Sequence, residues 1–238
     1  VPIRELVYPT PSLRVATDID VLVAPEDKIV ATRALTSAGF QLFTKGISIS
    51  HEVTLEKNQG QIDLHWDILR PGRTRIPLTR ELLDQRVEVD NIWSPSPTAT
   101  LFLMLVHPVI TKYCNSPTAS VIRLLDICLW LKKYPTDWDA LFELLDRSGL
   151  KTAAWTMLEW LQTLTGTTVP DDFREAIQPG PVRRKYLQTW LAKDLSTRLI
   201  NWPYAVQTGF TLANHDRLAD VVRTSLSAVQ ARRAGGQL

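Results

Sequence analysis

The chain has 238 residues, of which 45% are hydrophobic and 22% are charged, and its net charge is +2. This apolar fraction excludes a disordered chain, and the near-neutral charge argues against a nucleic-acid binder held by a global basic field. The sequence contains no apolar run of about 18 residues, so we expect no helical membrane span. The two cysteines, Cys114 and Cys128, are too few for a disulfide framework or a zinc site, and we expect a cytoplasmic protein.

The composition differs between two parts of the chain. Residues 1–100 carry a net charge of −2 and residues 101–238 a net charge of +4, and six of the eight tryptophans follow residue 129. Ser94-Pro95-Ser96-Pro97 consists of turn-forming residues and marks the boundary. We therefore predict an α/β core over residues 1–95, incomplete at its N-terminus, and a helical domain over residues 96–238, which together give an α+β fold.

The first predicted elements are a strand, a helix and a hairpin. Residues 17–23 are mostly apolar and rich in β-branched residues, which is typical of a central strand. Pro25 opens a helix with an apolar stripe, and Gly39 ends it. The two-residue alternation over Ile47–Leu55 and the second strand over Gln61–Ile68 surround an Asn-Gln-Gly turn, which predicts an antiparallel hairpin.

The remaining elements are mostly helical. A short helix over Thr79–Gln85 and a last strand over Val87–Trp93 precede the boundary. Beyond the boundary, apolar residues recur with the helical period. This period predicts helices over Thr98–Val106, Ser116–Lys133, Trp138–Ser148, Lys151–Leu164, Pro181–Arg198 and Asn214–Arg232.

Two carboxylates share one face of the first predicted strand. Asp18 and Asp20 are two residues apart, so their side chains point the same way, and we expect them near the C-terminal end of the strand, where α/β proteins place their ligands. Two like charges inside an apolar strand repel each other unless a cation lies between them. The pair therefore indicates a metal site, although solvated carboxylates on an exposed strand face would show the same spacing.

The returning strand adds a second polar face. Asp63, His65 and Asp67 alternate with apolar residues, and Asp63 completes a three-carboxylate cluster if this strand neighbours the first. Oxygen ligands without cysteine favour Mg²⁺ or Mn²⁺. Two such ions about 4 Å apart are the usual device for phosphoryl or nucleotidyl displacement. An ordinary half-exposed sheet would produce the same alternation.

An ordered set of motifs over residues 8–68 resembles a known family. The set comprises Tyr8-Pro9, Leu13-Arg14, the Asp18–Val23 strand, Ala38-Gly39-Phe40, His51 and Ile62-Asp63-Leu64-His65-Trp66. It is similar to the uncharacterised nucleotidyltransferase family of the DNA polymerase β-like superfamily, which implies a small mixed sheet as the core. The helical continuation also resembles that family in His107, Lys112 and Arg123–Ile127.

The resemblance implies a reaction and roles for the carboxylates. The reaction moves a nucleoside monophosphate from an NTP to an acceptor hydroxyl and releases pyrophosphate. Asp18 and Asp20 would bind both of two catalytic ions, Mg²⁺ or Mn²⁺, and Asp63 would bind one ion and help to deprotonate the attacking hydroxyl. The acceptor would be a small molecule, a peptide or a protein. Nucleic acid is not favoured, because basic clusters are few.

The resemblance also suggests substrate contacts. Arg14 would contact phosphate or a carboxylate of the cluster, and His65 would touch substrate or a metal-bound water. Lys112 is the first candidate to hold the triphosphate, and Arg123 is the second. Each has a structural alternative: a salt-bridge arginine for Arg14, a hydrogen-bonded sheet histidine for His65, and solvated charges for the other two. Asp126 either orients one of these cations or makes a packing contact.

Other conspicuous side chains favour the core. His51 lies on the apolar register of its strand, which is typical of a buried histidine with satisfied hydrogen bonds. The tryptophans lie within amphipathic helices, where such side chains bury large areas.

One family element does not occur in the sequence. Relatives carry a Lys-Gly or Gly-Ser element ahead of the Asp-x-Asp strand, and this element grips the phosphates. It would fall at or just before Val1. If the N-terminus is trimmed, the nucleotidyltransferase assignment stands. If the protein lacks the element, the alternative is a non-catalytic or regulatory module, such as a toxin–antitoxin or biosynthetic-cluster partner.

Overall fold

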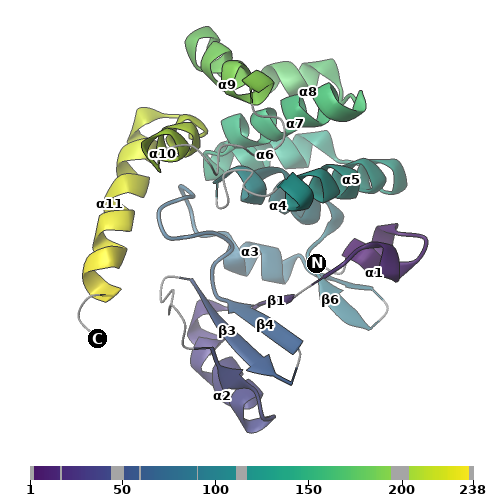
Figure 1. The fold of residues 1–238 in the computed structure, drawn as a ribbon, viewed down its shortest axis with the longest axis vertical. Coiled ribbons are helices and arrows are strands. Elements are labelled where there is room, and N and C mark those ends of the chain that lie inside the picture. Colours follow the sequence, from purple (N-terminus) through teal and green to yellow (C-terminus); the bar gives the residue numbers. More distant parts are fainter. Residues whose placement is uncertain are drawn as a thin grey trace.

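The fold has a small sheet at one end and stacked helices at the other (Figure 1). The computed structural model describes residues 3–16, 18–43, 51–58, 60–89, 91–110, 117–193 and 204–235. The predicted α+β class is confirmed, because a four-stranded mixed sheet and a two-stranded sheet precede a helical C-terminal region. Among the described helices, none is long and apolar enough to cross a membrane.

The larger sheet brings the predicted hairpin beside the first strand. Its order is β1-β4-β3-β2, with β1 parallel to β4 and the other pairs antiparallel. The strands are β1 Ile19–Leu22, β2 Gln41–Leu42, β3 Glu52–Lys57 and β4 Gly60–His65. In the hairpin turn Asn58 has a φ of 55°, a left-handed conformation that asparagine tolerates better than most residues. The hairpin is confirmed for its described residues, whereas the predicted alternation over residues 47–50 lies outside them. The pairing of β4 with β1 meets the condition that the three-carboxylate prediction required.

The position of β1 differs from the prediction in two respects. Within the described residues, β1 pairs with β4 alone and lies at the edge of the sheet rather than at its centre. The strand begins at Ile19, so Asp18 precedes it and Asp20 is near its start, not near its C-terminal end. The central position is wrong because an apolar run indicates a strand but not its neighbours, and Ile19 is 63% exposed. The C-terminal position of the aspartates is wrong because the strand begins later than predicted and has only four residues.

The connection after β1 is helical, as predicted. A 3-10 turn η2, Pro25–Asp27, leads into α2, Lys28–Ser37. Gly39 follows with a φ of 91°, a conformation that an L side chain would strain, so this glycine ends the helix as expected. All of α2 is described and none of its residues is buried, so its predicted apolar stripe is at most partly covered: Ile29 is exposed and Leu35 is half-buried.

A second small sheet replaces the predicted last strand. The short helix is confirmed as α3, Thr79–Asp84, but the following residues form an antiparallel hairpin of β5, Val87–Val89, and β6, Ile92–Ser94. Between these strands Asn91 has a φ of 61°. The chain therefore reverses inside a segment whose side chains alone suggest one continuous strand.

The helical region contains the predicted helices and further ones. Its helices are α4 Pro97–Ile110, α5 Pro117–Lys133, α6 Trp138–Ser148, α7 Lys151–Thr165, α8 Asp171–Ala176, α9 Pro181–Lys193, α10 Tyr204–Ala213 and α11 Leu218–Gly235. The sequence analysis did not predict α8, α10 or the short N-terminal helix α1, Ile3–Val7. The predicted extension of α9 to residue 198 lies outside the described residues.

The last predicted helix begins four residues late. Asn214 belongs to the turn after α10, because its side chain donates to the Phe210 carbonyl at 2.8 Å and accepts from the Thr156 hydroxyl at 2.6 Å. Through these two bonds Asn214 contacts the last turn of α10 and links it to α7. The next helix, α11, starts at Leu218.

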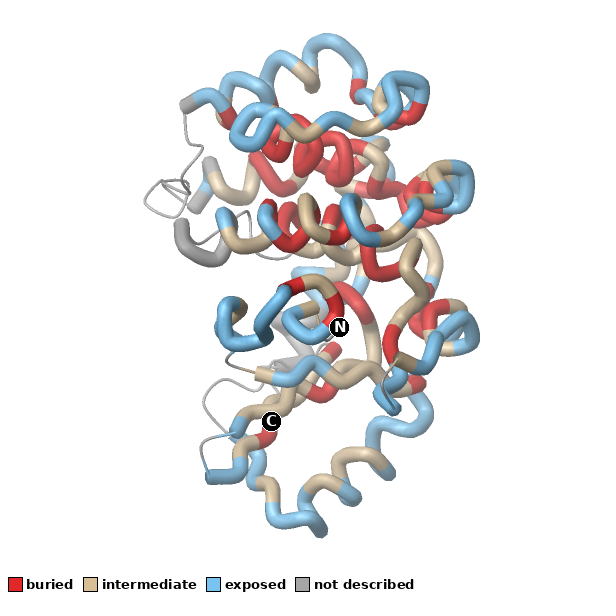
Figure 2. The backbone as a smooth tube through the Cα atoms, turned by 90° about the vertical axis from the view of Figure 1, so that its right-hand side faces the viewer, coloured by how far each residue is buried: buried red, intermediate tan, exposed pale blue. Residues whose placement is uncertain are grey.

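The hydrophobic core is centred on α4 and α7. Phe102, Leu105, Trp155 and Trp160 are each at most 1% exposed. Figure 2 shows buried backbone concentrated in the layers of helices. The core position predicted for tryptophans is confirmed for these two and for Trp130, which is 3% exposed. The same hydrophobic cluster includes Leu69 from the first part of the chain, so one core extends across the predicted boundary at residues 95/96, and that boundary stays a prediction.

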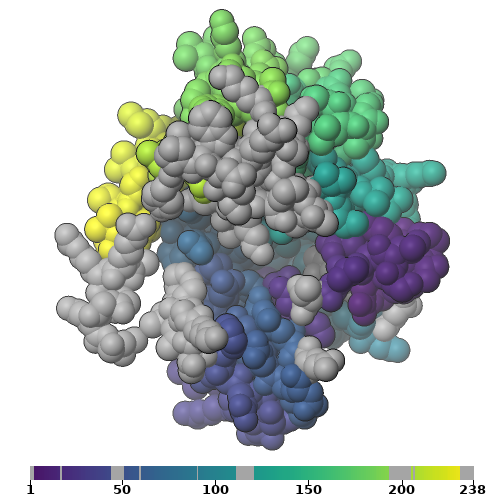
Figure 3. All heavy atoms as spheres, viewed as in Figure 1, coloured from purple at the N-terminus to yellow at the C-terminus, as the bar shows by residue number. Residues whose placement is uncertain are grey.

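A buried carboxylate fastens the N-terminal segment to α5. The Tyr8 hydroxyl donates to Asp126 Oδ1 at 2.7 Å, and Arg14 donates to the same carboxylate through Nε and Nη2 at 3.0–3.2 Å. Burial and the hydrogen bond to Asp126 raise the pKa of Tyr8. Figure 3 shows the N-terminal segment in purple against the teal helical region. Asp126 therefore makes a contact that ties this segment to α5.

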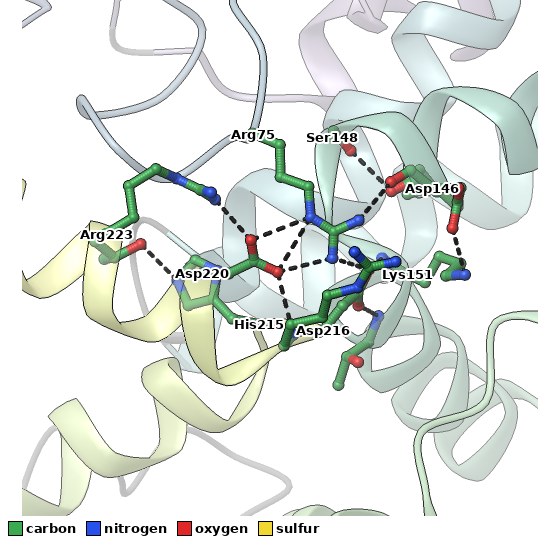
Figure 4. A network of polar contacts seen from close by, with 12 residues as sticks. Arg75, Asp146, Ser148, Lys151, His215, Asp216, Asp220 and Arg223 are labelled. Atoms are coloured by element: carbon green, nitrogen blue, oxygen red, sulfur yellow. Dashed lines mark hydrogen bonds and ion pairs between the residues drawn. The ribbon is translucent and has the colours of Figure 1, made fainter.

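A second polar cluster fastens α11 to the loop that follows β4. Arg75 in this loop donates to the Asp220 carboxylate of α11 at 2.8–3.2 Å and to the Asp146 carbonyl at 3.0 Å (Figure 4). The guanidinium thus joins the loop, the end of α6 and the start of α11 in one contact.

A buried histidine lies beside this cluster. Thr224 of α11 donates its hydroxyl hydrogen to the Gly72 carbonyl at 2.7 Å, and its oxygen lies 3.2 Å from His215 Nε2. Because that hydrogen is already used, His215 Nε2 must carry the proton in the second contact. Among the described residues, His215 Nδ1 has no partner. Burial, with the charge of Arg73, lowers the pKa of His215 to about 4.

Replacing Asp126 by asparagine tests the N-terminal contact. The substitution keeps the size of the side chain but removes the charge that Arg14 faces, so we expect the free energy of unfolding to fall by about 1–3 kcal/mol. Tyr8→Phe removes one neutral donor and should cost about 1 kcal/mol. Urea denaturation measures both values. An Asp126→Asn protein as stable as the wild type would contradict this role.

His215 should make the protein sensitive to acid. Its pKa of about 4 in the folded state lies below the ordinary value of 6.5, so between these values the unfolded chain binds more protons and stability falls as the pH decreases. The loss reaches about 1.4 kcal/mol per pH unit. We expect His215→Leu to be less stable than the wild type at pH 7 but to lose less stability between pH 6.5 and 4. Denaturation curves measured across this range test the prediction, which equal losses in both proteins would refute.

Candidate functional site

Two aspartates meet because their strands pair in parallel. The register places Asp20 of β1 directly beside Asp63 of β4, and His65 lies two residues further along β4 on the same face. The donor atoms of these three side chains all lie within 4.8 Å of one another. We call Asp20, Asp63 and His65 the sheet cluster. The Asp20 side chain is 63% exposed, so a ligand can approach the cluster from solvent.

His65 is held between two carboxylates. Its Nε2 lies 2.9 Å from Asp20 Oδ1, and its Nδ1 lies 3.2 Å from Glu52 Oε2. Glu52 is the register partner of His65 on β3, so the strand pairing itself sets the second contact. His51 Nε2 lies 3.4 Å from the same Glu52 oxygen. The result is a row of side chains that runs across the sheet from Asp20 to His51.

The titratable side chains of this row have pKa values that are shifted from their ordinary values. The hydrogen bond from His65 lowers the pKa of Asp20 to about 2, although the partial desolvation of this carboxylate opposes the shift. Burial alone would lower the pKa of His65, but the hydrogen bond to Asp20 and the charges of Asp20, Glu52 and Asp63 outweigh it and raise the pKa. Burial, with the charges of His65 and Arg70, lowers the pKa of His51 to about 4. At neutral pH His51 is therefore uncharged.

The sheet cluster suits a divalent metal ion. It offers two carboxylates and one imidazole on one face of the sheet, with donor atoms close enough to converge on a single ion. The pair Asp20 and Asp63 is the part of the predicted carboxylate set that the register brings together. Oxygen donors of this kind, without a thiolate among them, fit Mg²⁺ or Mn²⁺.

The other predicted site residues are not part of this donor group. Asp18 precedes β1, is half-buried, and belongs to none of the possible metal-binding groups among the described residues. Arg14 is engaged by Asp126 in an ion pair, as in its structural alternative. Arg123 lies half-buried on α5. Lys112 lies outside the described residues.

Two flanking residues differ in their relation to the cluster. The charge of His107 on α4 makes a small contribution to the lowered pKa of Asp20, after the larger effects of His65. Asp67, which was predicted to share the polar face, follows the end of β4. Its carboxylate accepts hydrogen bonds from the backbone N–H groups of Ile68 and Leu69, and burial raises its pKa. Asp67 therefore belongs to the turn after the strand.

Glu52 was not among the site residues predicted from the sequence. The signal was nevertheless present, because counting outward from the hairpin turn at Asn58 places Glu52 opposite His65. His51, interpreted as a core histidine, is confirmed as buried with 2% of its surface exposed. Its contact with Glu52 places it at the inner end of the row.

A family comparison covers this site and the first helices beyond it. The chain matches the family model described as uncharacterised nucleotidyltransferase over residues 1–166, which include the sheet cluster and helices α1 to α7. No curated protein and no solved structure matches the chain. The matched region exceeds two thirds of the sequence and contains the motifs that carry the resemblance. The chain therefore belongs to the uncharacterised nucleotidyltransferase family.

Proposed function

We propose that this protein is a metal-dependent enzyme that transfers a nucleoside monophosphate from an NTP to an acceptor hydroxyl and releases pyrophosphate. The observation that carries the proposal is the convergence of Asp20 and Asp63 on paired parallel strands inside the region that matches the family. Carboxylates brought together at an exposed edge of a sheet are suited to hold the ions that nucleotidyl transfer requires.

The chemistry assigns distinct tasks to the cluster. Two Mg²⁺ or Mn²⁺ ions are proposed. They would stabilise the negative charge that develops around the α-phosphate and would lower the pKa of the attacking hydroxyl. Asp20 and Asp63 hold the ions, and Asp18, just before β1, is proposed as a further ligand. Asp63 also receives the proton of the acceptor hydroxyl. The hydroxyl oxygen then forms a bond to the α-phosphorus, and the bond to the bridging oxygen breaks as pyrophosphate leaves with the electron pair.

The phosphate contacts come from the helical side in this proposal. Arg14 already pairs with Asp126, so it serves first to position the N-terminal segment. Lys112 follows α4 in the sequence, and Arg123 lies on the next helix, α5. Lys112 and Arg123 are therefore proposed to bind the triphosphate.

The acceptor is proposed to be a small molecule, a peptide or a protein in the cytoplasm. Two residues of the basic cluster at 183–185 are already engaged, since Arg183 donates to the carbonyls of His215 and Asp216 and Arg184 donates to Gln178. These contacts use N–H groups that would otherwise be available to a phosphate backbone, which does not favour RNA as the acceptor.

A labelling assay with single-residue variants tests the proposal. The wild type, with its native N-terminus, is incubated with α-labelled NTPs, Mg²⁺ or Mn²⁺, and a cell lysate as the source of acceptor. We expect Asp20→Asn and Asp63→Asn each to reduce labelling about 10²–10³-fold, because each removes a charge that holds the ions. Asp27→Asn is the matched control, since Asp27 is exposed and makes no side-chain cap to α2.

Two outcomes separate enzyme from non-catalytic module. Metal-dependent labelling that Asp27→Asn retains and Asp20→Asn loses supports the enzyme. Binding of NTP without transfer to any acceptor, unchanged by the Asp20 and Asp63 substitutions, would favour the regulatory module and overturn the proposal.

A further inference from the structure

The sheet cluster contains the imidazole of His65 beside its two carboxylates. The proposed function requires only the carboxylates. We propose that His65 is itself a metal ligand, together with Asp20 and Asp63, and that its imidazole makes the site bind Mn²⁺ in preference to Mg²⁺. This inference rests on the metal site of the proposed function and adds the identity of the third ligand and of the ion.

The geometry of His65 suits direct ligation. Ligands that sit next to each other on an octahedral ion with bonds of about 2.1 Å are about 3 Å apart. His65 Nε2 and Asp20 Oδ1 are 2.9 Å apart, and all three donors of the cluster lie within 4.8 Å of one another. Small rotations of Asp63 would complete the set. The Nε2 proton, which now faces Asp20, would pass to solvent when the ion binds.

The second nitrogen of the imidazole is held as metal-bound histidines usually are. Nδ1 lies 3.2 Å from Glu52 Oε2, so its N–H has a carboxylate to donate to, which leaves Nε2 as the nitrogen that faces the cluster. Glu52 is in turn contacted by buried His51, whose Nε2 is 3.4 Å from the same oxygen. The strand register fixes the position of Glu52, because Glu52 pairs with His65 across β3 and β4. His51 is the residue that precedes Glu52 in the sequence. This arrangement is a carboxylate–histidine pair directed at the sheet cluster.

The donor set determines the choice of ion. Mg²⁺ prefers oxygen ligands and keeps several waters, and an imidazole adds little to its affinity. Mn²⁺ takes the same carboxylate and phosphate oxygens as Mg²⁺, but as a first-row transition-metal ion it accepts an imidazole nitrogen more readily than Mg²⁺ does. Two carboxylates with one imidazole therefore favour Mn²⁺ over Mg²⁺.

Electron spin resonance of Mn²⁺ bound to the full chain tests the ligand directly. Electron spin echo modulation from a directly bonded imidazole nitrogen should appear in the wild type. In protein labelled with ¹⁵N-histidine, the ¹⁴N modulation should disappear and ¹⁵N lines should appear in its place. This measurement needs no substitution that could disturb folding. Bound Mn²⁺ without histidine modulation would overturn the inference and leave the carboxylate site intact.

Calorimetric titration with Mn²⁺ and Mg²⁺ tests the selectivity. We expect wild-type Kd to be at least about 10-fold lower for Mn²⁺, and His65→Asn to weaken Mn²⁺ binding about 10–100-fold while changing Mg²⁺ binding only slightly. Glu52→Gln should weaken Mn²⁺ binding about 10-fold through the orientation of His65. Glu56→Gln is the matched control, since Glu56 lies four residues along β3 on the same face and outside the cluster.

The remaining outcomes distinguish the inference from the proposed function. If His65→Asn weakened both ions equally, the selectivity would be refuted. If Mn²⁺ bound independently of Asp20 but required His51, the ion would lie in the neighbouring His51–Glu52–His65 group and the assignment to the sheet cluster would be wrong. If neither ion bound in a manner that depended on Asp20 and Asp63, the metal site of the proposed function would fail together with the inference.

Discussion

The site depends on the parallel pairing of β1 with β4. This register sets Asp20 beside Asp63 and directs both carboxylates to one face of the sheet. A slip of one residue would turn every side chain of β1 to the opposite face and would separate the pair. The antiparallel pairing of β4 with β3 then places Glu52 opposite His65. Two strand registers thus assemble a row of titratable side chains whose members are up to 45 residues apart in the sequence.

Two polar contacts fasten the N-terminal segment and α11 to other parts of the described chain. Asp126 of α5 fastens the N-terminal segment through Tyr8 and Arg14. Arg75, in the loop after β4, fastens α11 through Asp220. The second contact joins a loop of the region that matches the family to α11, which lies beyond residue 166, so α11 is anchored to the loop that follows the strand carrying Asp63. Arginine suits both positions, because its planar guanidinium meets a carboxylate through two nitrogens.

Much of this arrangement was predictable from the sequence, and the exceptions have physical causes. Alternation along β4 predicted the shared face of Asp63 and His65, and helical periodicity predicted α4 to α7. The edge position of β1 was not predictable, because apolar content reports burial on average but not which strands pair. The reversal at Asn91 was missed because three-residue strands give too short a pattern to separate from one longer strand. Glu52 was overlooked because its importance arises only from cross-strand register.

The most direct test of this account is a crystal structure of the full chain with Mn²⁺ and a non-hydrolysable NTP analogue. Anomalous scattering at the manganese edge would locate the ion without assumptions about its ligands. The account predicts an anomalous peak between Asp20, Asp63 and His65 Nε2, with the analogue's phosphate oxygens on the same ion. Manganese found elsewhere, with the sheet cluster still closed by the His65–Asp20 hydrogen bond, would contradict it.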